Sequence, residues 1–211
     1  MSKTLIALAF AGGIAAGGAS WWLAAPSPEP PQRSAAELMD VVMWNKEPIG
    51  GPFSLIDHAG KPRTDADFRG KLLLVYFGFS YCSDACPTDL QAIATAADKL
   101  GPSGDLVQPL FITVDPEKDT PEQLKGYVGL FHPRLIGLTG DVKQIRRLAN
   151  AYKVYFAKTD PEKWADPSID HFGFVFLMDA AGKYVGFFPP GTPPDRMADV
   201  IRPLVEAAHP L

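Results

Sequence analysis

Two patterns of hydrophobic and polar residues alternate along most of the chain. Residues 72–79 form a continuous apolar run with the length of a buried β-strand, and residues 106–114 predict a second buried strand. Residues 52–64 alternate apolar and polar positions around an Ala-Gly pair, as in a β-hairpin. Three later stretches repeat apolar residues every three or four positions, which predicts amphipathic helices: 90–100, 142–152 and 197–205.

Other sequence patterns predict further strands and a further helix, so that strands and helices alternate along the chain. Residues 135–138 are short and strand-like, and residues 172–178 and 184–188 flank "DAAGK", a hairpin turn. Thr120 before a proline and a glutamate predicts a helix cap. The order predicts an α/β fold, a thioredoxin-like three-layer sandwich with an N-terminal hairpin, over residues 48–211.

The N-terminal segment has a different character. No charged residue occurs in residues 4–28, which is slightly more than the roughly 20 residues that a membrane-spanning helix needs. Lys3 precedes the run, and Trp21 and Trp22 fall where an aromatic belt at the outer interface belongs. We therefore expect residues 1–25 to be a membrane anchor that leaves the rest of the protein outside the cytoplasm.

A cleaved signal peptide is the alternative, since Gly17 and Ala19 offer a small-x-small site. The following residues 26–47 are a proline-rich linker and lead-in, which favours an extended, semi-rigid spacer. This spacer would hold the domain away from the membrane.

Charge bears on the choice of partners. The 211-residue chain has a net charge of -4 and an isoelectric point near 5.5, and its lysines and arginines form no basic stripe. We therefore expect no nucleic-acid partner.

The chain has two cysteines, Cys82 and Cys86, in the stretch "FSYCSDACP". They follow a predicted strand and precede a helix predicted to begin at Pro87, so they lie on a strand-to-helix turn. A helix N-terminus lowers the pKa of a thiol. The spacing leaves two interpretations open, a disulfide or a two-thiolate metal site.

The candidate ligands narrow the choice of metal. Structural zinc requires four Cys or His ligands, and two cysteines with four histidines serve it poorly. Two soft thiolates and one imidazole suit copper. His171 is the best candidate, because it stands just before a late strand that should approach the cysteine turn. The other histidines have the sequence context of loop or cap residues: His58, His132 and His209.

Five segments, in order, resemble the Sco/SenC family of membrane-anchored copper proteins that serve cytochrome c oxidase assembly. They are "GGPFSLIDHAGKPRT", "FRGKLLLVYFGFSYCSDACP", "FITVDPEKDTPEQLKGYV", "PRLIGLTG" and "IDHFGFVFLMDAAGKYVG". The resemblance implies that Cys82, Cys86 and His171 bind copper. It also implies that Asp170, beside the histidine, supports His171 without binding the metal itself. Asp115 also matches a family motif, although a strand-ending acid that caps the next turn explains it equally well.

The resemblance also implies a location and partners. The domain would face the periplasm from the bacterial inner (cytoplasmic) membrane, as a copper metallochaperone for the oxidase subunit that carries the binuclear copper site. Another copper donor or a thiol reductant would act on it. The chain departs from the family where Ser80 and Tyr81 replace Thr-His and Ser83 replaces Pro.

Two other functions compete with copper delivery. A thiol–disulfide reductase would use Cys82 and Cys86 as a redox-active disulfide and keep the cysteines of the oxidase copper site reduced. That chemistry does not need His171, whereas copper binding does. A peroxide-reducing or copper redox-signalling protein on the same fold is a third interpretation, which no sequence feature singles out.

Overall fold

The computed structural model describes residues 47–158, 169–171 and 173–208. The predicted anchor and nearly all of the predicted linker lie outside these residues, and so does His209. Within the described part of the chain, no helix combines the length and the apolar character needed to cross a membrane.

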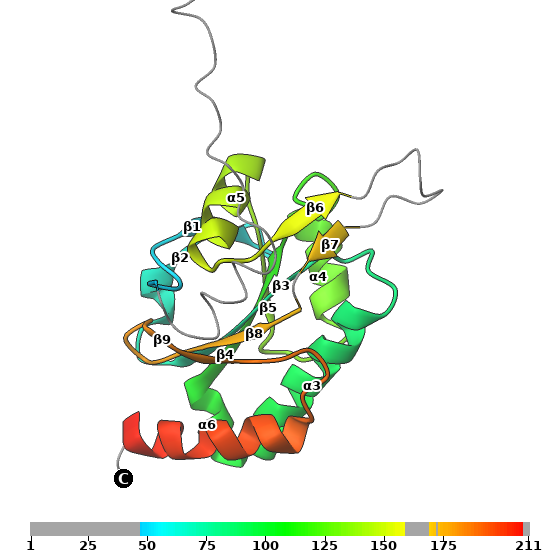
Figure 1. Cartoon of the computed structure of the whole chain (residues 1–211). Coiled ribbons are helices and arrows are strands. Elements are labelled where there is room, and N and C mark those ends of the chain that lie inside the picture. The colour runs from blue at the N-terminus through cyan, green and yellow to red at the C-terminus, as the bar shows by residue number, and fades with distance from the viewer. Residues whose placement is uncertain (1–46, 159–168, 172, 209–211) are drawn as a thin grey trace, which may run out of the picture. The chain divides into compact units, whose positions relative to one another are not determined.

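Strands and helices alternate through the domain (Figure 1). The strands are β1 (Ser54–Asp57), β2 (Pro62–Thr64), β3 (Leu72–Gly78), β4 (Val107–Thr113), β5 (Ile136–Thr139), β6 (Phe156–Lys158), β7 (Ile169–His171), β8 (Val175–Met178) and β9 (Tyr184–Phe188). The α-helices are α3 (Ala85–Lys99), α4 (Pro121–Val128), α5 (Val142–Ala151) and α6 (Pro194–Ala208). Two 3-10 helices, η1 (Asp65–Phe68) and η2 (Gly101–Leu106), precede β3 and β4.

Seven of the strands form one sheet in the order β2-β1-β5-β4-β3-β8-β9. β3 pairs in parallel with β4, and β4 in parallel with β5, whereas β8 runs antiparallel to β3. Every residue of β3 and β4 is buried, as expected for parallel strands covered on both faces. β6 and β7 form a separate antiparallel pair.

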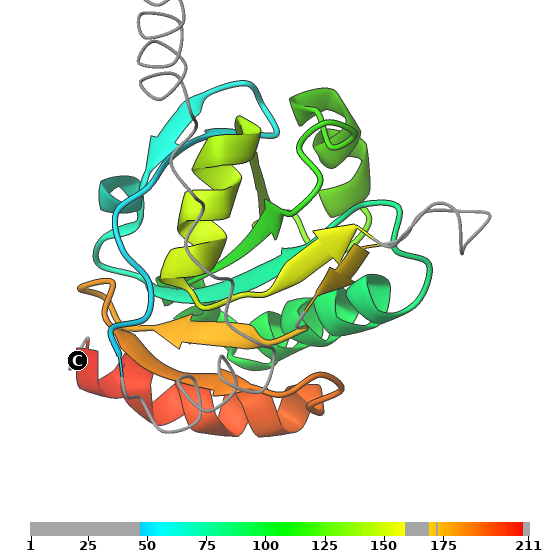
Figure 2. The same ribbon diagram turned by 45° about the horizontal axis from the view of Figure 1, so that its top comes forward.

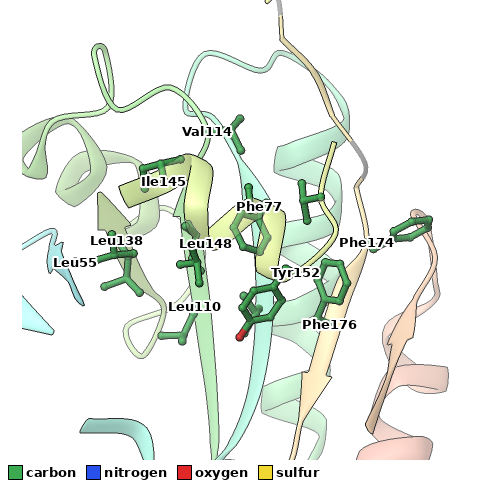
Figure 3. Close-up of a cluster of buried hydrophobic side chains, with 14 of the residues drawn as sticks. Leu55, Phe77, Leu110, Val114, Leu138, Ile145, Leu148, Tyr152, Phe174 and Phe176 are labelled. Carbon is green, nitrogen blue, oxygen red and sulfur yellow. The ribbon is translucent and has the colours of Figure 1, made fainter. Parts of the chain in front are cut away.

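Alternate side chains of β3 enter two different cores. Leu73, Val75 and Phe77 join the cluster under α5. Figure 3 shows part of this cluster, with Phe77 near Leu148. The intervening side chains, among them Tyr76, join the cluster made with α3, α4 and α6. The sheet therefore lies between two helical layers, and Figure 2 shows α5 on one face with α3 and α6 on the other. The predicted three-layer sandwich is confirmed.

The local predictions hold with small shifts. The β1–β2 hairpin turns at Gly60, whose φ is 77°, and Thr120 caps α4 by accepting a hydrogen bond from the backbone N–H of Gln123. The strand predicted over residues 172–178 begins only at residue 175. Residues 173 and 174 are not in a strand. The preceding strand, β7, pairs with β6 in a two-stranded sheet that the sequence pattern did not indicate. His171 is therefore the last residue of a strand.

Candidate metal centre

The two cysteines lie where β3 leaves the centre of the sheet and α3 begins. Cys82 is in the connecting loop, and Cys86 is the second residue of α3. The helix begins at Ala85, two residues earlier than predicted, so Pro87 falls inside the first turn, where its missing N–H is tolerated. Cys86 is consequently fixed by the helix, whereas Cys82 depends on the loop.

The sulfur of Cys82 occupies the N-terminus of α3. Its Sγ accepts a hydrogen bond from the backbone N–H of Cys86 at 3.4 Å. Asp84 precedes the helix as its N-cap but makes no side-chain capping bond. Since the first N–H groups of a helix have no partner within the helix, the Cys82 sulfur satisfies one of them.

His171 reaches the cysteines from the β6–β7 pair. Its Nε2 lies 3.4 Å from Sγ of Cys86. The imidazole meets the ring of Tyr76 edge-on at a centroid distance of 6.3 Å and the ring of Phe79 at 5.8 Å. Its Nδ1 is buried and has no hydrogen-bond partner among the residues that the structure describes. Two aromatic rings therefore orient the imidazole with Nε2 toward the cysteine.

The two sulfurs differ in access to solvent. Cys86 is fully buried at 0% exposure, whereas Cys82 is partly exposed, and neither is in a disulfide. Hydrogen bonds from the Cys86 thiol and from His171 hold the pKa of Cys82 well below its ordinary value, although partial burial opposes them. The neighbouring Cys82 sulfur and burial raise the pKa of Cys86. The reduced pair therefore has an accessible thiolate, Cys82, and an inner thiol, Cys86.

The three side chains predicted as ligands thus lie close together, with Cys82 and His171 both beside Cys86. Across residues 47–158, 169–171 and 173–208, no group of three or more His, Cys, Asp or Glu side chains is arranged so that it could hold a metal ion. The 3.4 Å contact between Cys86 and His171 is within hydrogen-bond distance for a sulfur. Two sulfurs and an imidazole nitrogen form a soft donor set that suits copper better than magnesium or calcium.

The sequence matches one known family over most of its length. The SCO1/SenC family model covers residues 42–206. The chain belongs to the SCO1/SenC family. Its curated relatives include the mitochondrial SCO2 homologue of Mus musculus, 39% identical over 161 residues, and the sco1 protein of Schizosaccharomyces pombe, 43% identical over 144 residues. The alignments cover 75% and 66% of this chain but 63% and 54% of those relatives, so the chain matches little more than half of their length.

Solved SCO1/SenC structures share the fold. ScoI of Arabidopsis thaliana with copper bound has a TM-score of 0.70 at 42% identity, over 75% of this chain and 99% of that one. ScoI of Bradyrhizobium japonicum with copper bound has a TM-score of 0.68 at 40% identity, over 74% and 99%. BsSco, described with a disulfide switch as a member of the Sco family of cytochrome c oxidase assembly proteins, has a TM-score of 0.59 at 25% identity, over 77% and 96%. The α/β thioredoxin-like fold of this chain is that of its family.

The other residues singled out in this SCO1/SenC sequence have structural partners. His58 accepts a hydrogen bond at Nδ1 from the N–H of Gly137. His132 lies with Nε2 3.1 Å from a carboxylate oxygen of Asp98. Asp115 is buried at 3% exposure in the turn after β4, where its carbonyl accepts hydrogen bonds from two following N–H groups. These bonds place Asp115 in the turn, and the role of its carboxylate stays a prediction.

Asp170, predicted to support His171, is paired through its backbone with Ala157 in the β6–β7 ladder. Its side chain lies outside the part that the structure describes. The supporting role of Asp170 stays a prediction.

Sequence reasoning missed a buried acid beside the site, Asp89. It is 3% exposed, and its carboxylate accepts hydrogen bonds from the Tyr76 hydroxyl at 3.2 Å and from the Gly191 N–H at 3.0 Å. Burial raises its pKa, while these two hydrogen bonds oppose that effect. Its position three residues after Cys86 and beside Leu90, on the apolar face of the helix, was the available signal.

Proposed function

We propose that this SCO1/SenC protein binds copper through Cys82, Cys86 and His171 and delivers it to the binuclear copper centre of cytochrome c oxidase during assembly. The observation that carries the proposal is the 3.4 Å approach of His171 Nε2 to Cys86 Sγ, with Cys82 at the start of the same helix. Two structurally similar relatives are known with copper bound, which supports the choice of metal.

The donor set suits monovalent copper. Cu(I) favours thiolates, and two of the three proposed ligands are sulfurs. Binding displaces the proton of the Cys86 thiol, because a cysteine coordinates a metal as the thiolate and a histidine as the neutral imidazole. The partial exposure of Cys82 leaves one ligand open to exchange.

Transfer then proceeds by substitution of ligands. A thiolate of the acceptor binds the copper as a transient fourth ligand, and the bond from copper to Cys82 breaks. The remaining bonds to Cys86 and His171 follow in the same way, and the oxidation state of copper does not change. Asp170, the neighbour of His171 in β7, is the proposed support for the imidazole.

We further propose that the domain works outside the cytoplasm on a membrane anchor. The support is in the sequence, where residues 4–28 carry no charge and a proline-rich segment follows. For a bacterial chain, the domain would then face the periplasm.

Copper analysis of the purified full-length chain tests the proposal. The reduced protein should bind one Cu(I) per chain in competition with a chelator, and formation of the Cys82–Cys86 disulfide should abolish binding. His171→Ala should greatly weaken binding, whereas His58→Ala, on the hairpin, should leave it unchanged. Full copper retention by the oxidised chain would rule out this site.

The contrast between the two sulfurs favours a second candidate, a thiol–disulfide reductase. The Cys82 thiolate would attack a disulfide of the oxidase subunit and form a mixed disulfide, and Cys86 would then attack Cys82. The client leaves with two thiols, its disulfide having taken two electrons, and the chain keeps a Cys82–Cys86 disulfide. A dithiol reductant would have to return these electrons.

His171 separates the two candidates. His171→Ala should remove copper delivery but leave the pair able to cycle between dithiol and disulfide. Oxidase assembly that survives His171→Ala but fails when either cysteine is replaced would favour the reductase. Failure of all three variants, with a normal reduction potential in His171→Ala, would favour copper delivery.

A further inference from the structure

The loop that carries the first cysteine is bound to a distant turn through one buried carboxylate. Asp119 lies in the turn between β4 and α4, and it accepts two hydrogen bonds from Ser80. The backbone N–H of Ser80 donates to Oδ2 at 3.0 Å, and the Ser80 hydroxyl donates to Oδ1 at 2.6 Å. Ser80 stands two residues before Cys82, so this contact fixes the point at which the cysteine loop leaves β3.

The same carboxylate is anchored to the sheet. Asp119 is 0% exposed and also accepts a hydrogen bond from the Thr113 hydroxyl, at the end of β4, at 2.6 Å. Gln123 of α4 donates to the Ser80 hydroxyl at 3.1 Å. Burial raises the pKa of Asp119, and the hydrogen bonds from Ser80 and Thr113 oppose that rise. One side chain therefore joins the ends of β3 and β4, with α4 adding a further contact to Ser80.

The bonding pattern calls for an acid at this position. All three groups that meet the carboxylate are donors, and an ionised carboxylate offers only acceptors. An asparagine would turn an NH₂ group against at least one of these donors and leave it unpaired in a buried site. Asn is therefore a poor substitute for Asp119 despite its similar shape.

A second contact joins the same two segments. Lys118, the residue before Asp119, places its ammonium group 5.6 Å from the ring centroid of Tyr81, the residue after Ser80. Tyr81 is 60% exposed. Two successive residues of the cysteine loop thus meet two successive residues of the β4–α4 turn, one pair through the buried Asp119 carboxylate and the other at the surface. Exposed cation–π contacts contribute little, so the buried pair carries the restraint.

We propose that Asp119 is a positioning residue for Cys82. Through its bonds to Ser80, Asp119 holds the cysteine loop at the place where Cys82 can meet Cys86 and His171. Cys86 needs no such restraint, because α3 fixes it. The expected loss of copper affinity rests on the copper function proposed above. The expected change in the reduction potential of the cysteine pair does not depend on that function.

The chain offers a matched control for ordinary loss of stability. Asp57 is also buried, at 2% exposure, and its carboxylate also accepts three hydrogen bonds. They come from the N–H groups of Ala59 and Lys61 and from Arg63. Asp57 belongs to the N-terminal hairpin, so Asp57→Asn should destabilise the fold and leave the cysteine pair unchanged.

The experiment compares Asp119→Asn with Asp57→Asn in the full-length chain. Each variant is measured for Cu(I) affinity, for the reduction potential of the Cys82–Cys86 pair in a glutathione redox buffer, and for stability to urea. We expect Asp119→Asn to weaken copper binding by about 10-fold or more, the range for residues that orient metal ligands, and to shift the reduction potential. Asp57→Asn should change stability alone.

A milder pair of variants covers the case in which Asp119→Asn does not fold. Ser80→Ala removes the hydroxyl and keeps the backbone bond to Asp119, so it should shift both site readouts in the same direction by less. Ser80→Thr keeps the hydroxyl and should behave as the unaltered chain.

Two results bear on the positioning role of Asp119. If Asp119→Asn or Ser80→Ala lowers stability but leaves both the reduction potential and the copper affinity unchanged, Asp119 has no positioning role. If the unaltered chain binds no copper, the copper function fails, and the reduction potentials of the same variants still decide the role of Asp119.

Discussion

Gly78, the last residue of β3, leaves the space that the Cys86 sulfur fills. A β-carbon at residue 78 would lie 2.9 Å from Sγ of Cys86 and 2.9 Å from a ring carbon of Phe111. It would also lie 3.0 Å from the Tyr76 ring. The Cys86 thiol therefore packs directly against Gly78, in a pocket that has no room for a β-carbon at residue 78.

Gly78→Ala should disturb the site as well as the core. Overpacking of a close-packed core typically costs about 1–3 kcal/mol, and here the nearest neighbour is the proposed ligand sulfur. We expect lower stability in urea unfolding and weaker Cu(I) binding. Gly186→Ala, in β9, is the control, because nothing lies within 4 Å of the added carbon. Equal copper affinity in both variants would show that this pocket does not set the position of Cys86.

Cys82 should react as a thiolate under mildly acidic conditions. A free cysteine has a pKa of about 8.5, and the hydrogen bond from Cys86 is the largest cause that lowers the pKa of Cys82. Alkylation of the reduced chain by iodoacetamide should therefore stay fast at a pH where the urea-unfolded chain reacts slowly.

Replacement of Cys86 tests the cause of that reactivity. Cys86→Ala removes the donor and should move the alkylation profile of Cys82 toward higher pH. Cys86→Ser keeps a donor and should move it less. A Cys86→Ala profile identical to that of the unaltered chain would mean that Cys86 does not stabilise the Cys82 thiolate.

The N-terminal hairpin should make the fold sensitive to acid. Burial raises the pKa of Asp57, but the hydrogen bonds from Lys61, Arg63 and Ala59 outweigh it and leave the pKa below 3.8. Because its pKa is depressed in the folded state, Asp57 contributes stability above the unfolded pKa, and this contribution is lost as the pH falls through the folded value.

Urea unfolding across a pH series measures that contribution. The stability difference between the unaltered chain and Asp57→Asn should be largest near pH 7 and should shrink progressively below about pH 5. A difference that stays constant down to pH 2 would show that the Asp57 carboxylate does not titrate with folding.

The proposed anchor predicts where the chain is found in the cell. The full-length protein should fractionate with membranes, and external protease should degrade its domain in spheroplasts. A variant that begins at residue 29 should lose the membrane association. Recovery of the full-length protein from the soluble cytoplasmic fraction would contradict the anchor.

Most of the fold and the convergence of the three proposed ligands could be predicted from local patterns. The apolar run of β3, followed by two cysteines and a helical repeat, places the pair on a strand-to-helix turn. His171 was placed correctly near that turn, because a late strand returns beside β3, as the β3–β8 pairing shows.

Contacts between distant segments could not be predicted in the same way. The β6–β7 pair depends on Phe156 meeting His171 across the ladder, and both strands are only three residues long. Asp119 and Asp89 each accept a bond from a residue far away in sequence, Ser80 and Gly191 respectively. In the sequence, a buried acidic residue cannot be distinguished from a solvent-exposed one until its hydrogen-bond donors are known.

The position of His171 has a consequence for the order of events in the life of the protein. Synthesis produces Cys86 85 residues before the histidine that contacts it, and Cys82 earlier still. An unfinished or unfolded chain can therefore offer two thiols but no imidazole at the correct place. The complete set of three donors exists only after β7 has docked beside the finished sheet. Only a folded chain can thus bind copper through all three proposed ligands. A misfolded chain remains a poor copper carrier even while both of its thiols are reduced.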